Sequence, residues 1–201
     1  MTINTTPRPN LGSGAIKFID GIAFEGLGSG GFDDNDLLIV GDGLDNLLEG
    51  GVGHDEIEGE VGNDILRGGN GNDILEGDAG NDDLDGQSGT EKLFGGDGND
   101  ILRAGDGYDR LSGGSGTDTF GFYGAGHFEI SDFSISDGDR LFFDSSKLGV
   151  HSLTELVSYI TKITDNGNSG FTAEFVGGAA TIEVVGVNIN AITADMVVFH
   201  L

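Results

Sequence analysis

The chain has 201 residues, of which 39 are glycine, and its 35 Asp and Glu residues far outnumber its 9 Lys and Arg residues. The formal charge of −26 argues against binding to nucleic acids or anionic membranes, and it favours cations as partners. The lack of cysteine excludes disulfides and thiolate metal sites.

The segment 1–31 is weakly patterned and is predicted to form an N-terminal extension. The apolar stretch Ile16–Phe24 is interrupted by Lys17, Asp20 and Gly21, so it fits neither a cleavable signal peptide nor a transmembrane helix. Just downstream, Asp36 and Leu38 resemble the Asp-x-apolar pairs described next, but they lie ten positions before Asn46 and Leu48. We therefore predict an irregular first turn there.

From Gly41 through Gly121 the sequence repeats with a period of nine. The pattern is Gly-Gly-x-Gly-x-Asp-x-U-x, in which U is apolar, and we number its positions one to nine. Position six is almost always acidic: Asn46, Asp55, Asp64, Asp73, Asp82, Glu91, Asp100, Asp109 and Asp118. Position eight is always apolar: Leu48, Ile57, Leu66, Leu75, Leu84, Leu93, Leu102, Leu111 and Phe120. A disordered acidic tract would not place an apolar residue at every ninth position.

This nonapeptide resembles the repeats of the RTX (repeats-in-toxin) calcium-binding family. The resemblance implies an all-β fold, a right-handed parallel β-roll over residues 32–121, in which two repeats form one turn. Glycines at positions one, two and four permit the tight loops, and each short strand directs its position-eight side chain inward. Residues 122–201 are then predicted to form a small β-rich C-terminal domain with one helix.

In the RTX fold, position-six residues that lie two repeats apart share a calcium ion with loop carbonyls. The resemblance therefore implies seven candidate Ca²⁺ sites, between Asn46–Asp64, Asp64–Asp82, Asp82–Asp100, Asp100–Asp118, Asp55–Asp73, Asp73–Glu91 and Glu91–Asp109. Calcium suits such sites because it accepts six to eight oxygen ligands in loose geometry. Asn46 and Glu91 depart from the motif, and Leu44 replaces a turn glycine, so their sites are expected to be the weakest.

The outward positions seven and nine of the strands predict the surface of the roll. On one sheet, position nine reads Glu49, Arg67, Asp85 and Arg103, a ladder of alternating charge whose members meet across neighbouring parallel strands. Position seven of the same sheet reads Leu47, Ile65, Asp83 and Ile101. Because three of these four are apolar, we predict that this face is covered, either by residues 10–32 or by the C-terminal domain. The opposite face is predicted to be bare, since its position seven is mostly charged: Glu56, Ile74, Lys92 and Arg110. The alternative is that β-branched residues merely favour strands.

Beyond the repeats, the sequence predicts strands at 128–133, 140–143, 171–176 and 180–185. Ser152 and Glu155 form a capping box, and the apolar spacing from Leu153 to Ile160 predicts an amphipathic helix. Asp195–Phe199, an acidic residue followed by apolar ones, resembles the uncleaved C-terminal signal of type I secretion substrates. The whole segment 122–201 resembles the secretion target domain of serralysin-like proteins. The alternative is that the last residues form a final core strand. The two interpretations are compatible, because a segment can act as an export signal first and form a strand later.

These features predict a secreted, calcium-binding module that folds on Ca²⁺ binding after export by a type I secretion exporter. The alternative is an extracellular carbohydrate- or matrix-binding module like the R-modules of alginate epimerases, with a polysaccharide as partner. No enzyme is expected, because no H-E-x-x-H or G-x-S-x-G motif occurs and because the stretch before Gly41 is too short for a catalytic domain. Neither nucleic acid binding nor membrane insertion is expected.

Overall fold

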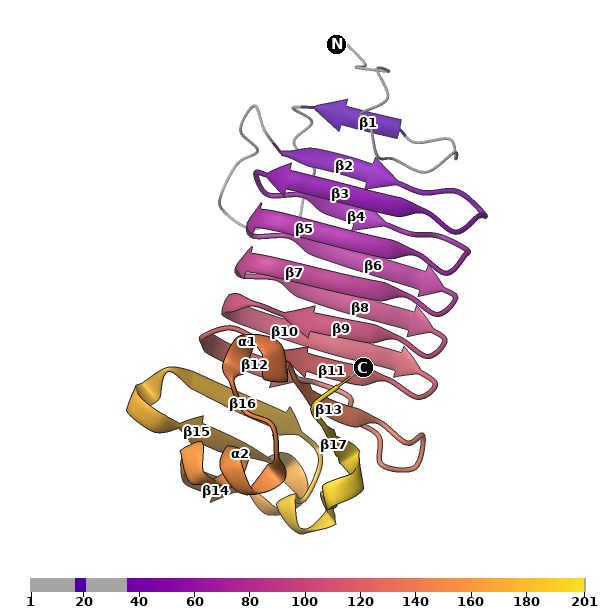
Figure 1. The fold of residues 1–201 in the computed structure, drawn as a ribbon. Coiled ribbons are helices and arrows are strands. Elements are labelled where there is room, and N and C mark those ends of the chain that lie inside the picture. The colour runs from indigo at the N-terminus through magenta and orange to yellow at the C-terminus, as the bar shows by residue number, and fades with distance from the viewer. Residues whose placement is uncertain (1–16, 21–35, 201) are drawn as a thin grey trace.

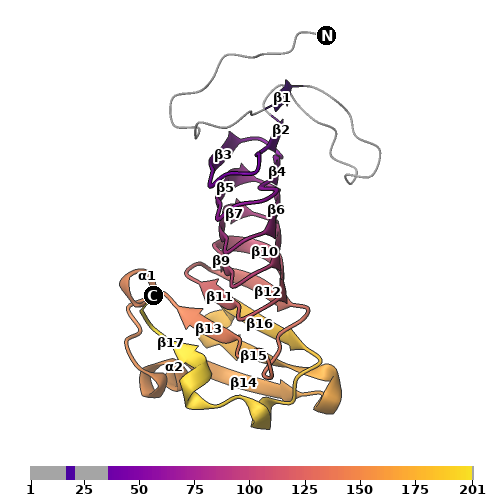
Figure 2. The same ribbon diagram turned by 90° about the vertical axis from the view of Figure 1, so that its right-hand side faces the viewer.

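The computed structural model describes residues 17–20 and 36–200, so most of the predicted N-terminal extension lies outside the described residues. The chain winds into a flattened coil whose successive turns stack along one axis, with a wider β-rich unit at its C-terminal end (Figure 1). Viewed from the side, the coil consists of two facing parallel sheets (Figure 2). The predicted parallel β-roll is therefore confirmed.

Each sheet takes its strands from alternate repeats, and we name each by one of its position-six residues. The Asp82 sheet contains β3 (Leu47–Val52), β5 (Ile65–Gly71), β7 (Asp83–Gly89), β9 (Ile101–Ala104), β11 (Thr119–Phe122), β13 (Arg140–Phe143) and β17 (Val197–Val198). The Asp73 sheet contains β2 (Leu37–Val40), β4 (Glu56–Glu58), β6 (Ile74–Ala79), β8 (Lys92–Asp97), β10 (Asp106–Ser115), β12 (Gly126–Ile130) and β16 (Ala180–Val185). A short strand, β1 (Lys17–Asp20), pairs antiparallel with β2.

The core is a double column of the predicted position-eight side chains. Leu66 of β5 pairs with Leu84 of β7, which pairs with Leu102 of β9, each step advancing by two repeats. All three side chains are fully buried. Each turn of the roll thus contributes one apolar side chain from each sheet, which is why a chain so poor in apolar residues can still form a continuous core.

The loop glycine at position four lets successive turns of the roll stack closely. Gly80 has a φ of +150°, and a Cβ on it would lie 1.5 Å from the carbonyl oxygen of Gly62, the same position one turn earlier. Position two is less strict, because Glu60, Asp78 and Gln87 adopt a φ of 67–73° there. Leu44 occupies position four of the first complete repeat and is 56% exposed.

The first turn is regular, contrary to our prediction. Ile39, and not Leu38, pairs with Ile57 and is fully buried. The backbone N–H of Leu37 donates to Asp55 Oδ1 at 2.8 Å, as that of Asn46 does to Asp64 Oδ1. Leu37 therefore occupies position six and Asp36 position five, so the nine-residue register extends unbroken to β2.

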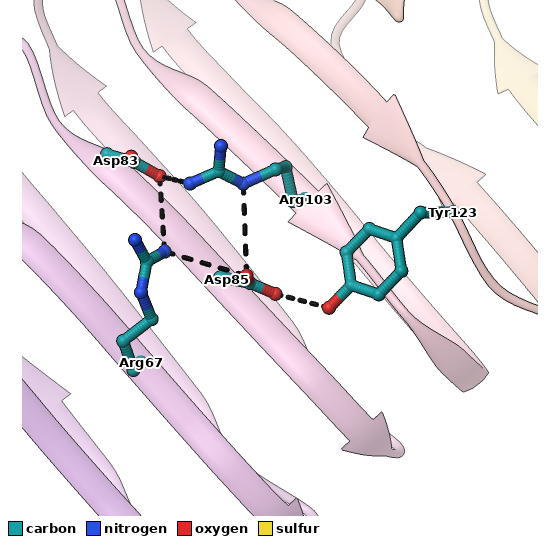
Figure 3. A network of polar contacts seen from close by, with 5 residues as sticks. All are labelled: Arg67, Asp83, Asp85, Arg103 and Tyr123. Atoms are coloured by element: carbon teal, nitrogen blue, oxygen red, sulfur yellow. Dashed lines mark hydrogen bonds and ion pairs between the residues drawn. The ribbon is translucent and has the colours of Figure 1, made fainter. Parts of the chain in front are cut away.

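On the outer face of the Asp82 sheet, the predicted charge ladder forms a network around two aspartates (Figure 3). Arg67 Nη1 lies 3.4 Å from Asp83 Oδ1 and 3.6 Å from Asp85 Oδ2. Arg103 contacts both aspartates, and the Tyr123 hydroxyl donates to Asp85. The prediction that this face is covered is wrong at Ile65, which is 37% exposed. Ile101 is only partly buried, as is Ile74 on the opposite face, so the two faces do not differ as predicted. The paired arginines supply a polar outer surface beside Ile65.

Parallel stacking continues past residue 121 into the C-terminal unit. β13 pairs in parallel with β11 in the Asp82 sheet, and β12 pairs in parallel with β10 in the Asp73 sheet. Two helices come next, α1 (Ser145–Leu148) and α2 (Leu153–Tyr159), where the sequence predicts one. Ser152 Oγ caps α2 by accepting from the Glu155 N–H at 3.2 Å, and Glu155 in turn accepts from the His151 N–H.

The rest of the unit is a hairpin added to the end of the Asp73 sheet. β14 (Ile160–Asp165), which the sequence analysis missed, pairs antiparallel with β15 (Gly170–Phe175), and β15 pairs with β16. Short 3-10 turns lie at Gly167–Ser169, Val176–Gly178, Ile189–Ala191 and Ala194–Met196. The predicted final strand is β17, whose Val197 and Val198 pair with β13. None of the helices in the described part of the chain is long and apolar enough to cross a membrane.

Candidate metal centre

Eight of the nine predicted metal-binding residues lie at the point where a loop enters a strand, and the ninth, Asp109, lies inside β10. They form two rows along the roll, which we call the Asp82 edge and the Asp73 edge after the sheets they precede. The side chains are at most 4% exposed: Asn46, Asp55, Asp64, Asp73, Asp82, Glu91, Asp100, Asp109 and Asp118. The fold therefore brings carboxylates from distant positions in the sequence into buried columns.

Along the Asp82 edge, each carboxylate accepts a hydrogen bond from the backbone of the preceding turn. Asp82 Oδ1 accepts from the Asp64 N–H at 2.7 Å, and Asp100 Oδ1 accepts from the Asp82 N–H at 2.8 Å. Asp118 Oδ1 continues the series with the Asp100 N–H at 3.0 Å. One oxygen of each carboxylate is thus committed to holding adjacent turns together.

The Asp73 edge contains the same ladder with one gap. Asp73 Oδ1 accepts from the Asp55 N–H at 2.9 Å, and Asp109 Oδ1 accepts from the Glu91 N–H at 3.1 Å. Glu91 does not continue the series, because both of its carboxylate oxygens are buried and lack a hydrogen-bond partner among the described residues. The longer side chain places its oxygens beside its own loop, where a Cβ on Gly89 would lie 2.5 Å from Oε1.

The second oxygen of most carboxylates fits a calcium ligand. The Oδ2 atoms of Asp64, Asp73, Asp82, Asp100 and Asp109 are buried and have no hydrogen-bond partner in the part of the chain that the structure describes. Such an oxygen is costly unless a cation or a proton compensates it. The position-one glycine beside it leaves room. At Gly77, a Cβ would lie 2.6 Å from both Asp82 Oδ2 and the carbonyl oxygen of Gly95 in the next turn. Carboxylate and carbonyl oxygens therefore converge, and this is the donor set that calcium prefers.

Side chains alone do not complete a site. Among residues 17–20 and 36–200, no three His, Cys, Asp or Glu side chains gather closely enough to hold a metal ion. Any ion bound at these edges would need backbone carbonyls as further ligands, as the sequence analysis expected. The sharing of one ion by two carboxylates of successive turns stays a prediction.

Burial raises the pKa values of these carboxyl groups. It raises the pKa of Asp73, Asp82 and Asp118 from 3.8 to about 6, and that of Asp100 to about 7. The backbone hydrogen bonds to Oδ1 act in the opposite direction but are outweighed. Burial, together with the adjacent Asp109 carboxylate, also raises the pKa of Glu91. Without a cation, the folded roll therefore disfavours the charged carboxylates.

The Asp82 edge has a further member, Asp139, which lies outside the nine-residue period and was not predicted. Asp139 is 2% exposed, and its Oδ1 accepts from the Asp118 N–H at 2.9 Å. Its Oδ2 accepts from the Ser134 N–H at 2.7 Å, so both oxygens are used and the ladder ends there. The signal was Asp139-Arg140-Leu141, an Asp-x-apolar triplet that follows Asp118 at a spacing outside the nine-residue period.

The loops carry a second, exposed ladder at position five. The Asn63 side-chain carbonyl accepts from the Asn81 N–H at 2.9 Å, and that of Asn81 accepts from the Asn99 N–H at 2.8 Å. On the Asp73 edge, His54 Nδ1 accepts from the Asn72 N–H at 2.8 Å. These contacts align the loops from the solvent side, so the spacing of the buried carboxylates is held on both flanks.

Comparison with known protein families identifies the repeat. Residues 30–66, 49–84 and 85–120 match the RTX calcium-binding nonapeptide repeat. The resemblance seen in the sequence is therefore confirmed for this part of the chain. No curated protein matches the chain significantly.

Several solved structures are similar to this chain, including a lipase and an epimerase subunit. The extracellular lipase LipA from Serratia marcescens is 20% identical over 82% of this chain and 40% of the lipase chain, with a TM-score of 0.34. The AlgE6R3 subunit of the mannuronan C5-epimerase from Azotobacter vinelandii is 24% identical over 76% of this chain and 78% of that subunit, with a TM-score of 0.39. This chain thus spans less than half of the lipase. Neither protein's activity transfers to this chain at such similarity.

Proposed function

We propose that this protein, which carries RTX calcium-binding repeats, is a calcium-triggered folding module of an extracellular protein and not an enzyme. The observation that carries the proposal is the pair of buried carboxylate columns, in which successive Oδ2 atoms face backbone carbonyls and lack a hydrogen-bond donor among the described residues. Residues 41–121 hold 20 Asp and Glu residues against 4 Lys and Arg residues. At neutral pH such a column repels itself unless cations neutralise it.

The proposal explains how one chain could be exported and then fold. Extracellular calcium modules have dissociation constants of about 10⁻⁴–10⁻³ M, so the sites would stay empty at cytosolic calcium levels. The empty chain would remain unfolded and able to pass an exporter. Outside the cell, binding energy would become folding energy, because the site does not exist in the unfolded chain.

Circular dichroism and small-angle scattering of the full chain test the calcium step. We expect an expanded chain with little β-structure in chelator, and a compact β-rich one in millimolar Ca²⁺. Magnesium at the same concentration serves as the control and should act weakly, because it demands small octahedral sites. Identical spectra and dimensions in chelator and in calcium would refute the proposal.

The export role of the C-terminus needs its own experiment. Deleting the last ten residues should abolish export by a type I exporter, but it also removes β17. Val197→Pro is the matched variant, because it disrupts the pairing of Val197 with Leu141 while keeping the segment. Export that survives Val197→Pro and fails on deletion supports a signal, whereas undiminished export of the deleted chain would contradict it.

A glycan-binding role is the second candidate, and one surface favours it. Lys92 and Arg110 are exposed neighbours on β8 and β10. Arg110 Nε lies 3.3 Å from Glu129 Oε2, whereas Lys92 makes no ion pair within the described residues. Phe94 is 41% exposed beside them, and Tyr108 stacks on His127 with ring centroids 4.5 Å apart. Exposed cations attract the carboxylates of an acidic sugar chain, and exposed rings offer apolar faces to its sugar rings. The formal charge of −26 opposes such a ligand over the rest of the surface.

An array of acidic glycans, probed in calcium, tests this second role. Lys92→Glu should abolish any binding found on the array. Lys162→Glu, at a cation paired with Glu174 on the terminal hairpin, is the control and should leave it intact. Absence of binding by the native chain would remove this candidate.

A further inference from the structure

An apolar cavity of about 420 Å³ lies where the roll meets the C-terminal unit. Its walls come from the turn after β11, from β13, from α1 and α2, and from the connection between β15 and β16. These elements surround the last turns of the roll (Figure 1). The calcium-edge residues do not line the cavity, so the proposed calcium function does not account for it.

Buried aromatic rings form the floor. Phe122, Phe128 and Phe143 are at most 5% exposed. The ring centroid of Phe122 lies 5.2 Å from that of Phe128 and 5.5 Å from that of Phe143. These rings belong to the continuous core, so close packing on their other sides holds the floor in place.

The rim is apolar and open to solvent. Leu148 is 36% exposed, Tyr159 is 47% exposed and Val176 is 50% exposed, and all three line the cavity. In a chain with a formal charge of −26, such a group of exposed apolar side chains is unexpected. Exposed apolar groups around a concave site are typical of ligand or partner binding.

The polar side chains in the lining decide the class of ligand. Asp106 is the one charged side chain among the described lining residues, and its Oδ1 accepts from the Ala125 N–H at 2.8 Å. The Tyr123 hydroxyl is already donated to Asp85, and Lys147 Nζ lies 3.4 Å above the Tyr123 ring. A negative charge in the lining repels an anionic head group, and the remaining lining offers mostly apolar surface.

We propose that this cavity binds a small, uncharged hydrophobic molecule with an aromatic or aliphatic body. Its volume falls within the range of about 300–1,000 Å³ that is usual for small-molecule sites. An engineered apolar cavity of about 150 Å³ already binds benzene, so this one holds a larger molecule. The rim residues would cover the exposed end of the ligand.

The test uses the full chain in millimolar Ca²⁺ and the uncharged fluorophore N-phenyl-1-naphthylamine. We expect saturable one-to-one binding with a micromolar dissociation constant. The anionic 1-anilinonaphthalene-8-sulfonate should bind at least tenfold more weakly. The variant Asp106→Asn retains an acceptor for the Ala125 N–H but removes the negative charge, so it should reduce the difference in affinity between the two dyes. Because all titrations are done in calcium, failure of dye binding is distinct from failure of calcium-driven folding.

Variants locate the bound probe. Ala180→Leu fills the cavity from β16 and should weaken binding at least tenfold, whereas Ala191→Leu, at an exposed alanine outside the lining, should not change it. Val176→Asp charges the rim at a half-exposed site, so it gives a second reading if Ala180→Leu misfolds. Lack of saturable binding, or binding indifferent to both lining variants, overturns the proposal. So does self-association detected by light scattering that these variants abolish, since the rim would then be a protein interface.

Discussion

The two edges of the roll share one backbone but differ in their position-six side chains. The Asp82 edge has an unbroken run of aspartates from Asp64 to Asp118, extended by Asp139. The Asp73 edge is bounded by Leu37 and Phe128, which occupy the same place at its two ends, and it carries Glu91 in the middle. Since the strands and turns continue through all of these positions, the winding of the chain does not depend on every carboxylate.

Protonation of the buried carboxylates on both edges should promote folding of the calcium-free chain. Of the four changes considered, we expect this one to have the largest effect on folding. The pKa values of Asp73, Asp82 and Asp100 are raised from 3.8 to about 6–7 in the folded roll. A raised folded-state pKa contributes stability below the unfolded value, and that stability is lost as pH rises through the folded value. Without calcium, the roll should therefore gain β-structure between pH 8 and pH 4.

Circular dichroism in metal-stripped buffer measures this effect without relying on a chelator that weakens in acid. In calcium the sign should reverse, because protons compete with Ca²⁺ for the same oxygens. A calcium-free spectrum that does not change over this pH range would show that burial of the carboxylates does not oppose folding.

Replacing a position-four glycine should reduce stability by the same amount on either edge, because the backbone has the same conformation on both. Gly80→Ala and Gly71→Ala place a Cβ within 1.5–1.6 Å of a carbonyl oxygen one turn away, and each should cost at least about 3 kcal/mol of stability in calcium. Gln87→Ala at position two is the control, because its φ of 72° already accommodates a side chain. Thermal unfolding in calcium gives the comparison. Tolerance of alanine on one edge alone would mean that the two backbones differ.

Asp139 should be the residue that closes the Asp82 edge. Asp139→Ala leaves the buried N–H of Asp118 and the partly buried N–H of Ser134 without their acceptor. The loss at the buried donor should cost about 1–3 kcal/mol, and the loss at Ser134 less. Asp137→Ala, at an exposed residue of the same turn, is the control. Hydrogen exchange at Asp118 should accelerate in the first variant and not in the second. Equal protection in both would remove Asp139 from the ladder.

Glu91→Asp should make the Asp73 edge resemble the Asp82 edge in stability and calcium affinity. Of the four predicted effects, we expect this one to be the smallest. The shorter side chain can accept from the Asp73 N–H, as aspartates do elsewhere on both edges. We expect about 1 kcal/mol of added stability and less than a tenfold gain in calcium affinity by calorimetry. Asp82→Glu is the reciprocal variant and should produce the opposite change. No gain from Glu91→Asp, with full occupancy of its sites in the native chain, would contradict the idea that Glu91 weakens this edge.

The repeat made most of the roll predictable from sequence. Period and turn chemistry are local properties: glycines at fixed positions allow the loops, and one apolar residue in nine, such as Leu84, must face inward. The same period identified the buried row of carboxylates, because equivalent positions of alternate repeats necessarily stack in a coil of two repeats per turn. The helix after Ser152 was likewise local, since its cap and its apolar spacing are adjacent in the chain.

Other features depended on which backbone each segment pairs with. Asp36-x-Leu38 imitated the motif, yet pairing with β4 placed Ile39 inside, because cross-strand hydrogen bonds and burial set the register. Asp139 accepts from the Asp118 N–H although the two residues lie more than two repeats apart in sequence. The longer loop before Asp139 can bulge outward and still place Asp139 directly next to Asp118. The outer face that holds Ile65 stays open because ion pairs formed across strands, and the apolar cavity exists because α1, α2 and the β15–β16 connection meet around the last turns of the roll. Contacts between segments far apart in sequence decide such features, and a local pattern carries no record of them.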